Sequence, residues 1–180
     1  MPTGLKQTSG QIEVSFTQQS VTGTFGQKRI DLQLNALDNE VFVVTGVKMD
    51  LTTPQCNLTG VAANLDPETF AALTTQPTTT MPTLADSTCF ATAAEKFRVL
   101  EEIQAGGGYA VAFGSIENAI DTPHSMDYLA IIATPNFYVS TDGSPDNSNA
   151  NRVYGKLYGY RAQASSSIYA SLVQSELLSS

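Results

Sequence analysis

Hydrophobic and polar residues alternate along much of this chain with a period of two, which is the spacing of a β-strand with one face in a core. The cleanest alternation covers residues 30–35, where Ile30, Leu32 and Leu34 are separated by polar residues. Residues 128–132 instead form a continuous apolar run, which is typical of a strand buried on both faces. These patterns predict about eight strands, in residues 12–16, 30–35, 41–51, 96–104, 109–113, 128–132, 153–162 and 167–178, with residues 136–140 as a continuation of the strand before them or a ninth strand.

The mid-chain segment of residues 96–104 is best interpreted as a half-buried strand. Phe97 and Val99 fall on one parity, whereas charged residues dominate the other. A helix is the competing interpretation, because some apolar residues here also lie at helical spacing. The glycines at 106–108 then predict a turn. Residues 109–113 alternate again, so the two segments are expected to form a pair of sheet strands.

The third predicted strand, residues 41–51, differs from the others in its length and its pattern. Apolar residues share one parity over most of this segment. Phe42 and Val44 lie on the other parity and need cover from a second layer. The preceding Asp38 and Asn39 predict a hairpin turn between the second and third strands.

Prolines and glycines shape the predicted strands in the last third of the chain. Pro135 makes residues 136–140 either a bulged continuation of the preceding strand or a separate edge strand. Residues 142–149 are a surface loop by composition. In residues 153–162 the tyrosines fall on one parity and the glycines on the other. Another group is therefore expected to approach this strand closely at its glycines.

Two short helices are predicted between the strands. Residues 52–87 lose the alternation and form a structured excursion, in which an aspartate followed by a proline provides the start signals of a helix over residues 66–73. A serine can cap one helical turn over residues 115–120. The last segment, residues 167–178, is favoured as a strand, and a serine-capped helix is its alternative interpretation.

Composition favours an all-β fold in a single domain that spans residues 1–180. The chain is 42% hydrophobic and 14% charged, and Thr, Ser, Asn and Gln supply much of its polar character. Such uncharged polar residues suit strands and loops, whereas helical surfaces usually carry more Glu, Lys and Arg. We therefore predict a two-sheet antiparallel sandwich with a long loop insertion and one or two short helices.

Net charge narrows the class of partners. The formal net charge is -8 and the isoelectric point is about 4.4. These values argue against direct binding of nucleic acid, because that affinity comes largely from Lys and Arg that displace counterions. No apolar run approaches the roughly 20 residues that a membrane-spanning helix needs, and the first residues lack the apolar stretch of a signal peptide. We expect neither a transmembrane segment nor a cleaved signal.

Histidine and cysteine are too few to predict a reactive centre. His124 is the only histidine, so a hydrolase of the histidine-dependent type would have to be centred there. It follows Pro123 in a polar loop without a Gly-x-Ser-x-Gly motif, and a surface residue is the favoured interpretation. Cys56 and Cys89 are the only cysteines, and two buried thiols are favoured over a disulfide. Together these residues do not make a zinc ligand set.

Carboxylates do not predict a reactive or metal-binding site either. Asp142, Asp146 and Asn147 offer oxygens to calcium, but their spacing misses the EF-hand pattern, and a polar hairpin loop is favoured. Glu101 and Glu102 are adjacent on a strand and so point to opposite faces, which keeps them from flanking one substrate. We therefore expect no catalytic, cofactor-binding or metal-binding residue in this chain and no enzymatic activity.

Tyr154, Tyr158 and Tyr160 make up an aromatic strip on one face of the predicted strand 153–162. Such a strip is able to bind carbohydrate, which is why a carbohydrate-binding sandwich stays open as an interpretation. An aromatic strand face is more often core or a subunit contact, however, and we expect this strip to be buried.

Residues 96–102 have the sequence Lys-Phe-Arg-Val-Leu-Glu-Glu, and residues 153–178 are rich in tyrosine. The first segment looks like the aromatic, basic, Val-Leu, acidic mid-chain strand of small viral coat proteins, and the chain as a whole resembles the single jelly-roll capsid proteins of icosahedral viruses. It lacks the basic N-terminal arm of coat proteins that package nucleic acid directly. It is therefore more similar to the small major capsid proteins of tailless, membrane-containing viruses of archaea and bacteria.

That resemblance implies a single jelly roll that stands upright in pseudo-hexameric capsomers, beside copies of itself and a second capsid protein. It also implies a place in the virion, assembly in the host cytoplasm, a possible contact with an internal membrane, and no catalytic residue. The alternatives are a carbohydrate- or receptor-binding β-sandwich, such as a spike or fibre head, and a hydrolase centred on His124. Residues 52–87 and the loop near Asp142 are expected to mediate subunit contacts or to face outward.

Overall fold

The protein is built mainly from β-strands, as the computed structural model shows for residues 4–57, 63–104, 107–118 and 127–178. These residues contain eleven strands, a short 3-10 helix η1 (Ala36–Asp38) and one α-helix, α1 (Ser166–Leu178). The strands are β1 (Leu5–Gln7), β2 (Ile12–Ser20), β3 (Gly26–Asp31), β4 (Glu40–Leu51), β5 (Ala63–Leu65), β6 (Glu68–Thr74), β7 (Cys89–Gln104), β8 (Gly107–Asn118), β9 (Ala130–Ile132), β10 (Asn136–Gly143) and β11 (Asn151–Ala164).

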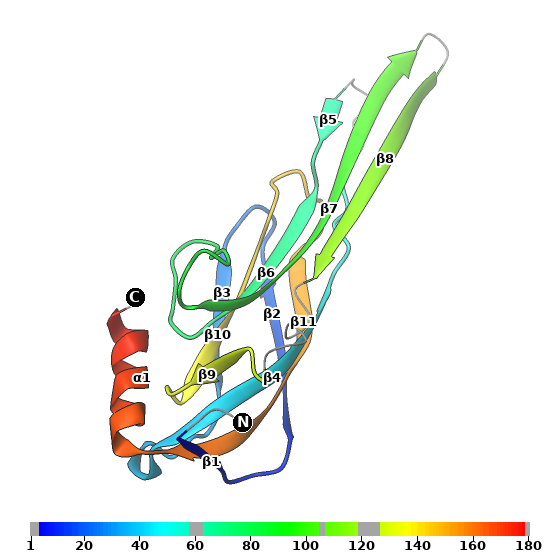
Figure 1. Ribbon diagram of the computed structural model, residues 1–180. Coiled ribbons are helices and arrows are strands. Elements are labelled where there is room, and N and C mark those ends of the chain that lie inside the picture. The colour runs from blue at the N-terminus through cyan, green and yellow to red at the C-terminus, as the bar shows by residue number, and fades with distance from the viewer. Residues whose placement is uncertain (1–3, 58–62, 105–106, 119–126, 179–180) are drawn as a thin grey trace.

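The strands form two antiparallel sheets (Figure 1). In the first sheet, β11 pairs with β4 along one edge and with β2 and β1 along the other, and β9 pairs with the far edge of β4. In the second sheet the order is β3, β10, β6 and β7, and β8 pairs with the far edge of β7. The short β5 pairs with β7 beyond the start of β6.

The order in which the strands are connected is that of a jelly roll. Without the short strands β1 and β5 and the hairpin strand β8, eight strands remain. Numbered in chain order, they form one sheet of order 1-8-3-6 and another of order 2-7-4-5. This is the strand order of a jelly roll made of two Greek keys. The predicted all-β, two-sheet antiparallel sandwich is confirmed.

A hydrophobic core fills the space between the sheets. Phe42 of β4 and Leu157 of β11 pack there with Leu73 of β6 and Phe137 of β10, and each is at most 1% exposed. Phe16 of β2 meets Phe137 edge to face, with ring centroids 5.9 Å apart. Full burial of a side chain of this size stabilises a fold by roughly 1.5–3 kcal/mol. Burial of these apolar side chains is therefore the main contribution to the stability of the two-sheet sandwich.

The helix α1 covers one end of the first sheet on its outer face (Figure 1). Val41 and Val43 of β4 point to that face and are fully buried, because α1 packs a row of apolar side chains against the cluster they form. That row consists of Ile168, Tyr169, Leu172 and Val173. β4 is thus covered on both faces. The faces are exchanged relative to the prediction, because Phe42 and Val44 face the core between the sheets and Val41 and Val43 face the helix. The register of β4 with β11 shifts at Thr45, so residues 41–44 and residues 47–49 do not share one parity.

The prediction of a strand over residues 167–178 is wrong, and its helical alternative is right. Ile168 and Leu172 lie four residues apart, as do Tyr169 and Val173, so a helix brings all four onto one face. No long-range strand partner competes for this segment among the described residues. The apolar row of a helix therefore explains the pattern better than the parity of a strand does.

A buried carboxylate holds the C-terminal half of α1 against the sheet. Glu176 is 9% exposed, and it accepts hydrogen bonds from the backbone N–H groups of Ala133 at 2.9 Å and Thr134 at 3.2 Å. Burial raises the pKa of Glu176, and these hydrogen bonds lower it by less. Its carboxylate satisfies two backbone donors just after β9, so it fixes both the helix and the turn that leads to β10.

The hairpin of β7 and β8 is longer than the sheet that carries it, and its outer part projects from the sandwich (Figure 1). β7 pairs with β6 only as far as Lys96. Beyond that point, residues 97–104 pair with residues 107–114 of β8 and, at three positions, with β5. We call residues 97–104 and 107–114 the arm. Its eight residue pairs extend roughly 26 Å at the rise of a β-strand.

The arm confirms the predicted strand over residues 96–104 and its pairing with residues 109–113. The helical alternative for this segment is wrong, because β7 has strand partners on both edges along part of its length. The predicted glycine turn falls partly outside the described residues, which exclude Gly106, whereas Gly107 and Gly108 already belong to β8.

Two predicted helices are strands instead. β6 occupies most of the segment 66–73 and lies in the middle of the second sheet, between β10 and β7. Its Ala71, Ala72 and Leu73 are fully buried, because strand pairing on both edges outweighs the local start signals of a helix. Residues 115–118 likewise continue β8, and the remainder of that predicted helical turn lies outside the described residues.

Three further predictions differ from the structure in detail. The turn at Asp38 and Asn39 is present, with Asn39 left-handed at φ 53°, but β3 and β4 belong to different sheets and do not form a hairpin. The strand predicted over residues 30–35 ends at Asp31, two residues before Gln33, which has φ 54°. Residues 136–140 begin a separate strand, β10, that is central rather than an edge, because it pairs with both β3 and β6.

Candidate interaction surfaces

A buried asparagine ties the loop before β11 to the start of β6. Asn147 is 5% exposed. Its Nδ2 donates to the carbonyl oxygen of Glu68 at 2.7 Å and to Oδ1 of Asn151 at 2.5 Å. Its Oδ1 accepts from the backbone N–H of Glu68 at 3.0 Å. Asn147 therefore acts as a strand neighbour for Glu68, because it satisfies both of that residue's backbone groups.

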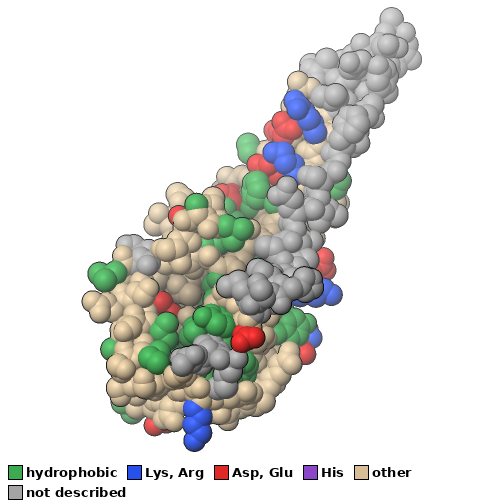
Figure 2. Space-filling model, viewed as in Figure 1, with side chains coloured by type: hydrophobic (Ala, Val, Ile, Leu, Met, Phe, Trp, Pro, Cys, Tyr) green, Lys and Arg blue, Asp and Glu red, His purple; other side chains and the backbone are tan. Residues whose placement is uncertain are grey.

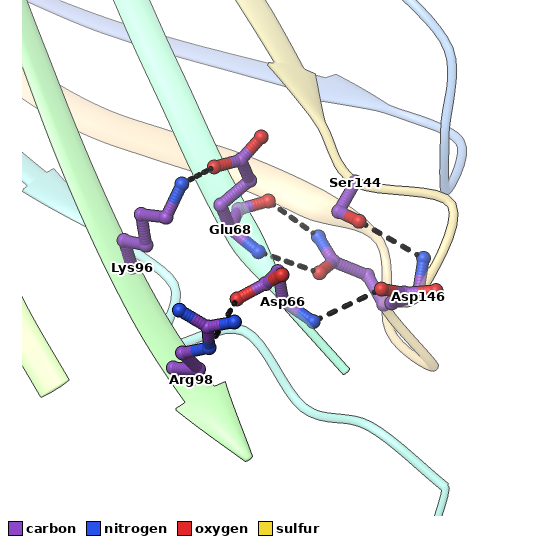
Figure 3. Close-up of polar contacts among 7 residues, drawn as sticks. Asp66, Glu68, Lys96, Arg98, Ser144 and Asp146 are labelled. Carbon is purple, nitrogen blue, oxygen red and sulfur yellow. Dashed lines mark hydrogen bonds and ion pairs between the residues drawn. The ribbon is translucent and has the colours of Figure 1, made fainter. Parts of the chain in front are cut away.

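Other groups of this loop, residues 144–150, strengthen the same attachment (Figure 3). The backbone N–H of Ser144 donates to the carbonyl oxygen of Glu68 at 3.1 Å. The carboxylate of Asp146 accepts from the backbone N–H of Asp66 at 3.0 Å, and its own N–H donates to Oγ of Ser144 at 3.1 Å. We call this set of contacts the arm-base network, because it holds the segment that leads into β6 beside the root of the arm.

Two ion pairs join the same segment to β7 (Figure 3). The ammonium of Lys96 lies 2.9 Å from a carboxylate oxygen of Glu68, and Nε of Arg98 lies 3.7 Å from one of Asp66. The hydrogen bond to Glu68 raises the pKa of Lys96. Positive and negative side chains alternate at the root of the arm in Figure 2. Exposed pairs add little stability, so their effect is mainly to orient the arm.

The arm also offers an unpaired backbone edge. β8 pairs with β7, and no other strand of the described residues pairs with its far edge. Free N–H and C=O groups along such an edge form a template for a strand of another molecule. A two-stranded hairpin is also marginally stable in water on its own. The arm is therefore a candidate contact with a neighbouring molecule.

The tyrosine strip of β11 is divided between two environments. Tyr160 packs against the cluster beneath α1, whereas Tyr154 is 46% exposed and Tyr158 is partly exposed. The expectation that the whole strip is buried is wrong, because α1 covers only one end of this sheet. The expected close approach at the glycines is confirmed, since a Cβ at Gly155 would collide with the ring of Phe16.

The predicted reactive residues are not assembled into a site among the described residues. His124 and the side chains of Glu101 and Glu102 lie outside the described part of the chain. Cys56 and Cys89 are half-buried and unpaired, and burial raises the pKa of the Cys89 thiol to about 11. A thiol with that pKa is a poor nucleophile near neutral pH.

The calcium-type oxygens near β10 serve the fold. Asp142 accepts from the N–H of Gly143 at 2.8 Å, and Asp146 and Asn147 belong to the arm-base network. In the part of the chain that the structure describes, no group of three or more His, Cys, Asp or Glu residues is placed to hold a metal ion. The loop is also less exposed than predicted, because Ser144 and Asn147 are buried.

Sequence reasoning missed the residues that organise these surfaces. Asn147 and Asn151 stand in an asparagine-rich run that resembles any polar loop, and Glu176 resembles a solvated helix residue. Their roles depend on groups more than 40 residues away, which are the backbone of Glu68 for Asn147, the hydroxyl of Thr69 for Asn151 and the backbone N–H of Ala133 for Glu176. The richness in asparagine was the one local signal, since Asn side chains often hydrogen-bond to backbone in irregular segments.

No known protein family and no curated protein matches this chain. Within the described residues, no helix combines the length and apolar character needed to cross a bilayer.

Proposed function

We propose that this chain is a capsid subunit of an icosahedral virus, a structural protein of the virion without enzymatic activity. In this proposal its jelly rolls stand upright in pseudo-hexameric capsomers, in contact with copies of the chain and with a second capsid protein. The observation that carries the proposal is the arm, which projects beyond the two-sheet core and has an edge of β8 that no other strand of the described residues pairs with.

The arm supports assembly through its energetics. Beyond Lys96 the hairpin has no β6 partner, and β5 adds only three residue pairs on that edge. A two-stranded ribbon of this kind has little stability by itself in water. Contact with a neighbouring subunit would pair the free edge and remove the ribbon from solvent, so assembly stabilises a feature that is costly in the isolated chain.

The fold and the charge are consistent with a shell protein. Jelly rolls serve as capsid and lectin domains, so the fold alone does not select between these functions. A net charge of -8 disfavours direct contact with a nucleic acid genome. We infer that the inner side of the shell faces another layer, such as an internal membrane, and that assembly takes place in the host cytoplasm.

An arm-shortened variant tests the proposal. Arg98 and Phe113 are register partners, so replacing residues 99–112 with Asn-Gly closes the hairpin with a two-residue turn. The change removes the buried Val99 and the partner of β5, but it leaves intact the two hydrophobic clusters that hold the sheets and α1 together. The wild-type chain is expected to form capsomers or closed shells in sedimentation velocity and negative-stain electron microscopy. The variant is expected to stay monomeric and to unfold in a single cooperative transition, as a folded domain does.

Leu37→Ser is the matched control, because Leu37 is 94% exposed and lies on η1, away from the arm. This variant is expected to assemble like the wild type. A wild-type chain that stays monomeric at every protein and salt concentration, alone and with co-purified particle proteins, would contradict the proposal. Electron microscopy of the source material, which asks whether the chain lies in closed shells, is an independent check.

A further inference from the structure

An open groove of about 630 Å³ lies where β2, β3, β4 and β11 come together. Residues of all four strands line it, and none of them belongs to the arm-base network or to the arm. Its polar lining includes the hydroxyls of Ser15 and Thr17 and the carboxylate of Asp50. A volume of this size fits a ligand of two or three sugar rings.

Positive charge collects in this groove although the chain is acidic. Lys28, Lys48 and Lys156 line it, which is three of the nine basic residues in a chain of net charge -8. Lys48 and Lys156 are direct cross-strand partners in the pairing of β4 with β11, and both are exposed. Like charges in directly opposite positions destabilise a sheet. The fold therefore keeps an unfavourable pair here.

Acidic and carbonyl groups of the described residues contact only two of the three ammonium groups. Lys156 lies 2.8 Å from a carboxylate oxygen of Glu13, and Lys28 reaches the carbonyl oxygen of Thr17 at 3.5 Å. Lys48 has no hydrogen bond or ion pair within the described residues. An anion from outside the protein would complete the environment of Lys48 and offset its repulsion with Lys156.

Two tyrosines flank the lysine pair on the same face. Tyr154 and Tyr158 stand two residues before and after Lys156, so their Cα atoms are roughly 13 Å apart along the strand. The guanidinium of Arg152 lies 5.8 Å from the ring centre of Tyr154 and donates to its Oη at 2.8 Å. The ring of Tyr154 is therefore held in place although it is 46% exposed. Rigid aromatic side chains lose little entropy when a ligand binds.

We propose that this groove binds an acidic carbohydrate. The tyrosine rings stack on the apolar faces of pyranose rings, and Lys48 binds a carboxylate or sulfate group. The hydroxyls of Ser15 and Thr17 donate to or accept from sugar hydroxyls, and the carboxylate of Asp50 accepts hydrogen bonds from them. A lipid surface fits less well, because Tyr154 is the only strongly exposed large apolar side chain among the described residues that line the groove. A nucleic acid fits less well because Asp50 and Glu13 would repel its closely spaced phosphates.

Titration calorimetry on the purified chain tests this inference with three hexasaccharides. One alternates glucuronic acid and N-acetylglucosamine, one alternates glucuronic acid and sulfated N-acetylgalactosamine, and maltohexaose is the neutral probe. Binding of one or both acidic probes is expected, and the tighter one shows whether the groove prefers carboxylate or sulfate. Maltohexaose is expected to bind at least about tenfold more weakly, which corresponds to the loss of one charge-assisted contact.

Three variants locate the site. Lys48→Gln and Tyr154→Ala are each expected to weaken binding of the acidic probe about tenfold. Lys6→Gln is the matched control, because Lys6 is exposed on β1 and lies outside the groove, and it is expected to bind like the wild type. Lys48→Gln also removes the like-charge pair, so its melting temperature is expected to equal or exceed that of the wild type.

The inference is overturned if neither acidic probe binds, or if Lys6→Gln weakens binding as much as Lys48→Gln. Equal affinity for maltohexaose overturns it as well. Tighter binding of single-stranded oligothymidine, or of phosphatidylserine vesicles, would assign the groove to a different ligand. All these measurements use the isolated chain, so they are independent of whether the chain assembles into a shell.

Discussion

Replacing Asn147 with alanine is the most direct test of how the loop of residues 144–150 is held in the fold. The substitution removes three hydrogen bonds, two to the backbone of Glu68 and one to the side chain of Asn151. The Glu68 carbonyl keeps a donor in the N–H of Ser144, but the Glu68 N–H loses the partner seen in the structure. The main consequence is therefore one partly buried donor without an acceptor.

The expected cost follows from these contacts. A typical hydrogen bond contributes a net ~1 kcal/mol, and an unsatisfied buried group costs about 1–3 kcal/mol. Because two of the three partners keep another contact, we expect Asn147→Ala to lower the free energy of unfolding by about 3 kcal/mol. With a urea dependence of about 2 kcal/mol per molar, the unfolding midpoint should fall by about 1.5 M.

Asn149→Ala is the matched control, since it makes the same change two residues further along the loop. Asn149 also makes two hydrogen bonds to backbone, at 2.9 Å to the N–H of Gln55 and at 3.0 Å to the carbonyl of Thr53. These bonds are exposed, so water replaces them when the side chain is lost. We expect a cost below about 1 kcal/mol.

Urea unfolding followed by circular dichroism compares these variants. A third variant, Asn147→Asp, keeps the volume and the acceptor for the Glu68 N–H but replaces the donor with an oxygen that faces the Glu68 carbonyl. It should be at least as unstable as Asn147→Ala. The reasoning is refuted if Asn147→Asp is as stable as the wild type, because volume alone would then explain the effect, or if Asn149→Ala costs as much as Asn147→Ala.

Two further predictions concern α1 and the core. Burial raises the pKa of Glu176 in the folded state, so the folded protein binds the proton of this carboxyl group more tightly than the unfolded chain does. The stability that the protonated form contributes is therefore lost as pH rises through the folded-state pKa. Glutamine does not titrate, so Glu176→Gln should not lose this stability as pH rises. The free energy of unfolding of the variant, minus that of the wild type, should therefore increase between about pH 4 and pH 7. A difference that stays constant over this range contradicts the prediction. Gly155→Ala places a methyl group against the ring of Phe16 and should cost about 1–3 kcal/mol in urea unfolding. Gly46→Ala, whose nearest neighbour atom is 3.8 Å away, should cost less than half as much, and equal costs would contradict the packing argument.

Alternation with a period of two located most strands, because that signal lies entirely within each segment. β2, β4, β7 and β11 overlap the segments predicted for them. The same local signal, together with the scarcity of charged residues, was enough to predict an all-β sandwich. Where two local signals competed, as in residues 167–178, the sequence left both a strand and a helix open.

Position within the sheets depended on contacts between residues far apart in the chain. β6 carries local helix signals, yet β10 and β7 pair with both of its edges. Asn147 is buried only because the jelly roll brings it to Glu68, and Lys48 faces Lys156 only because β4 pairs with β11. Pairing between distant segments outweighs weak local preferences, since burial and hydrogen bonding stabilise a strand more than propensity does. The strand pattern could thus be predicted from the sequence. The arm-base network and the groove lined by Lys48 and Lys156 could not, because only the tertiary structure brings their residues together.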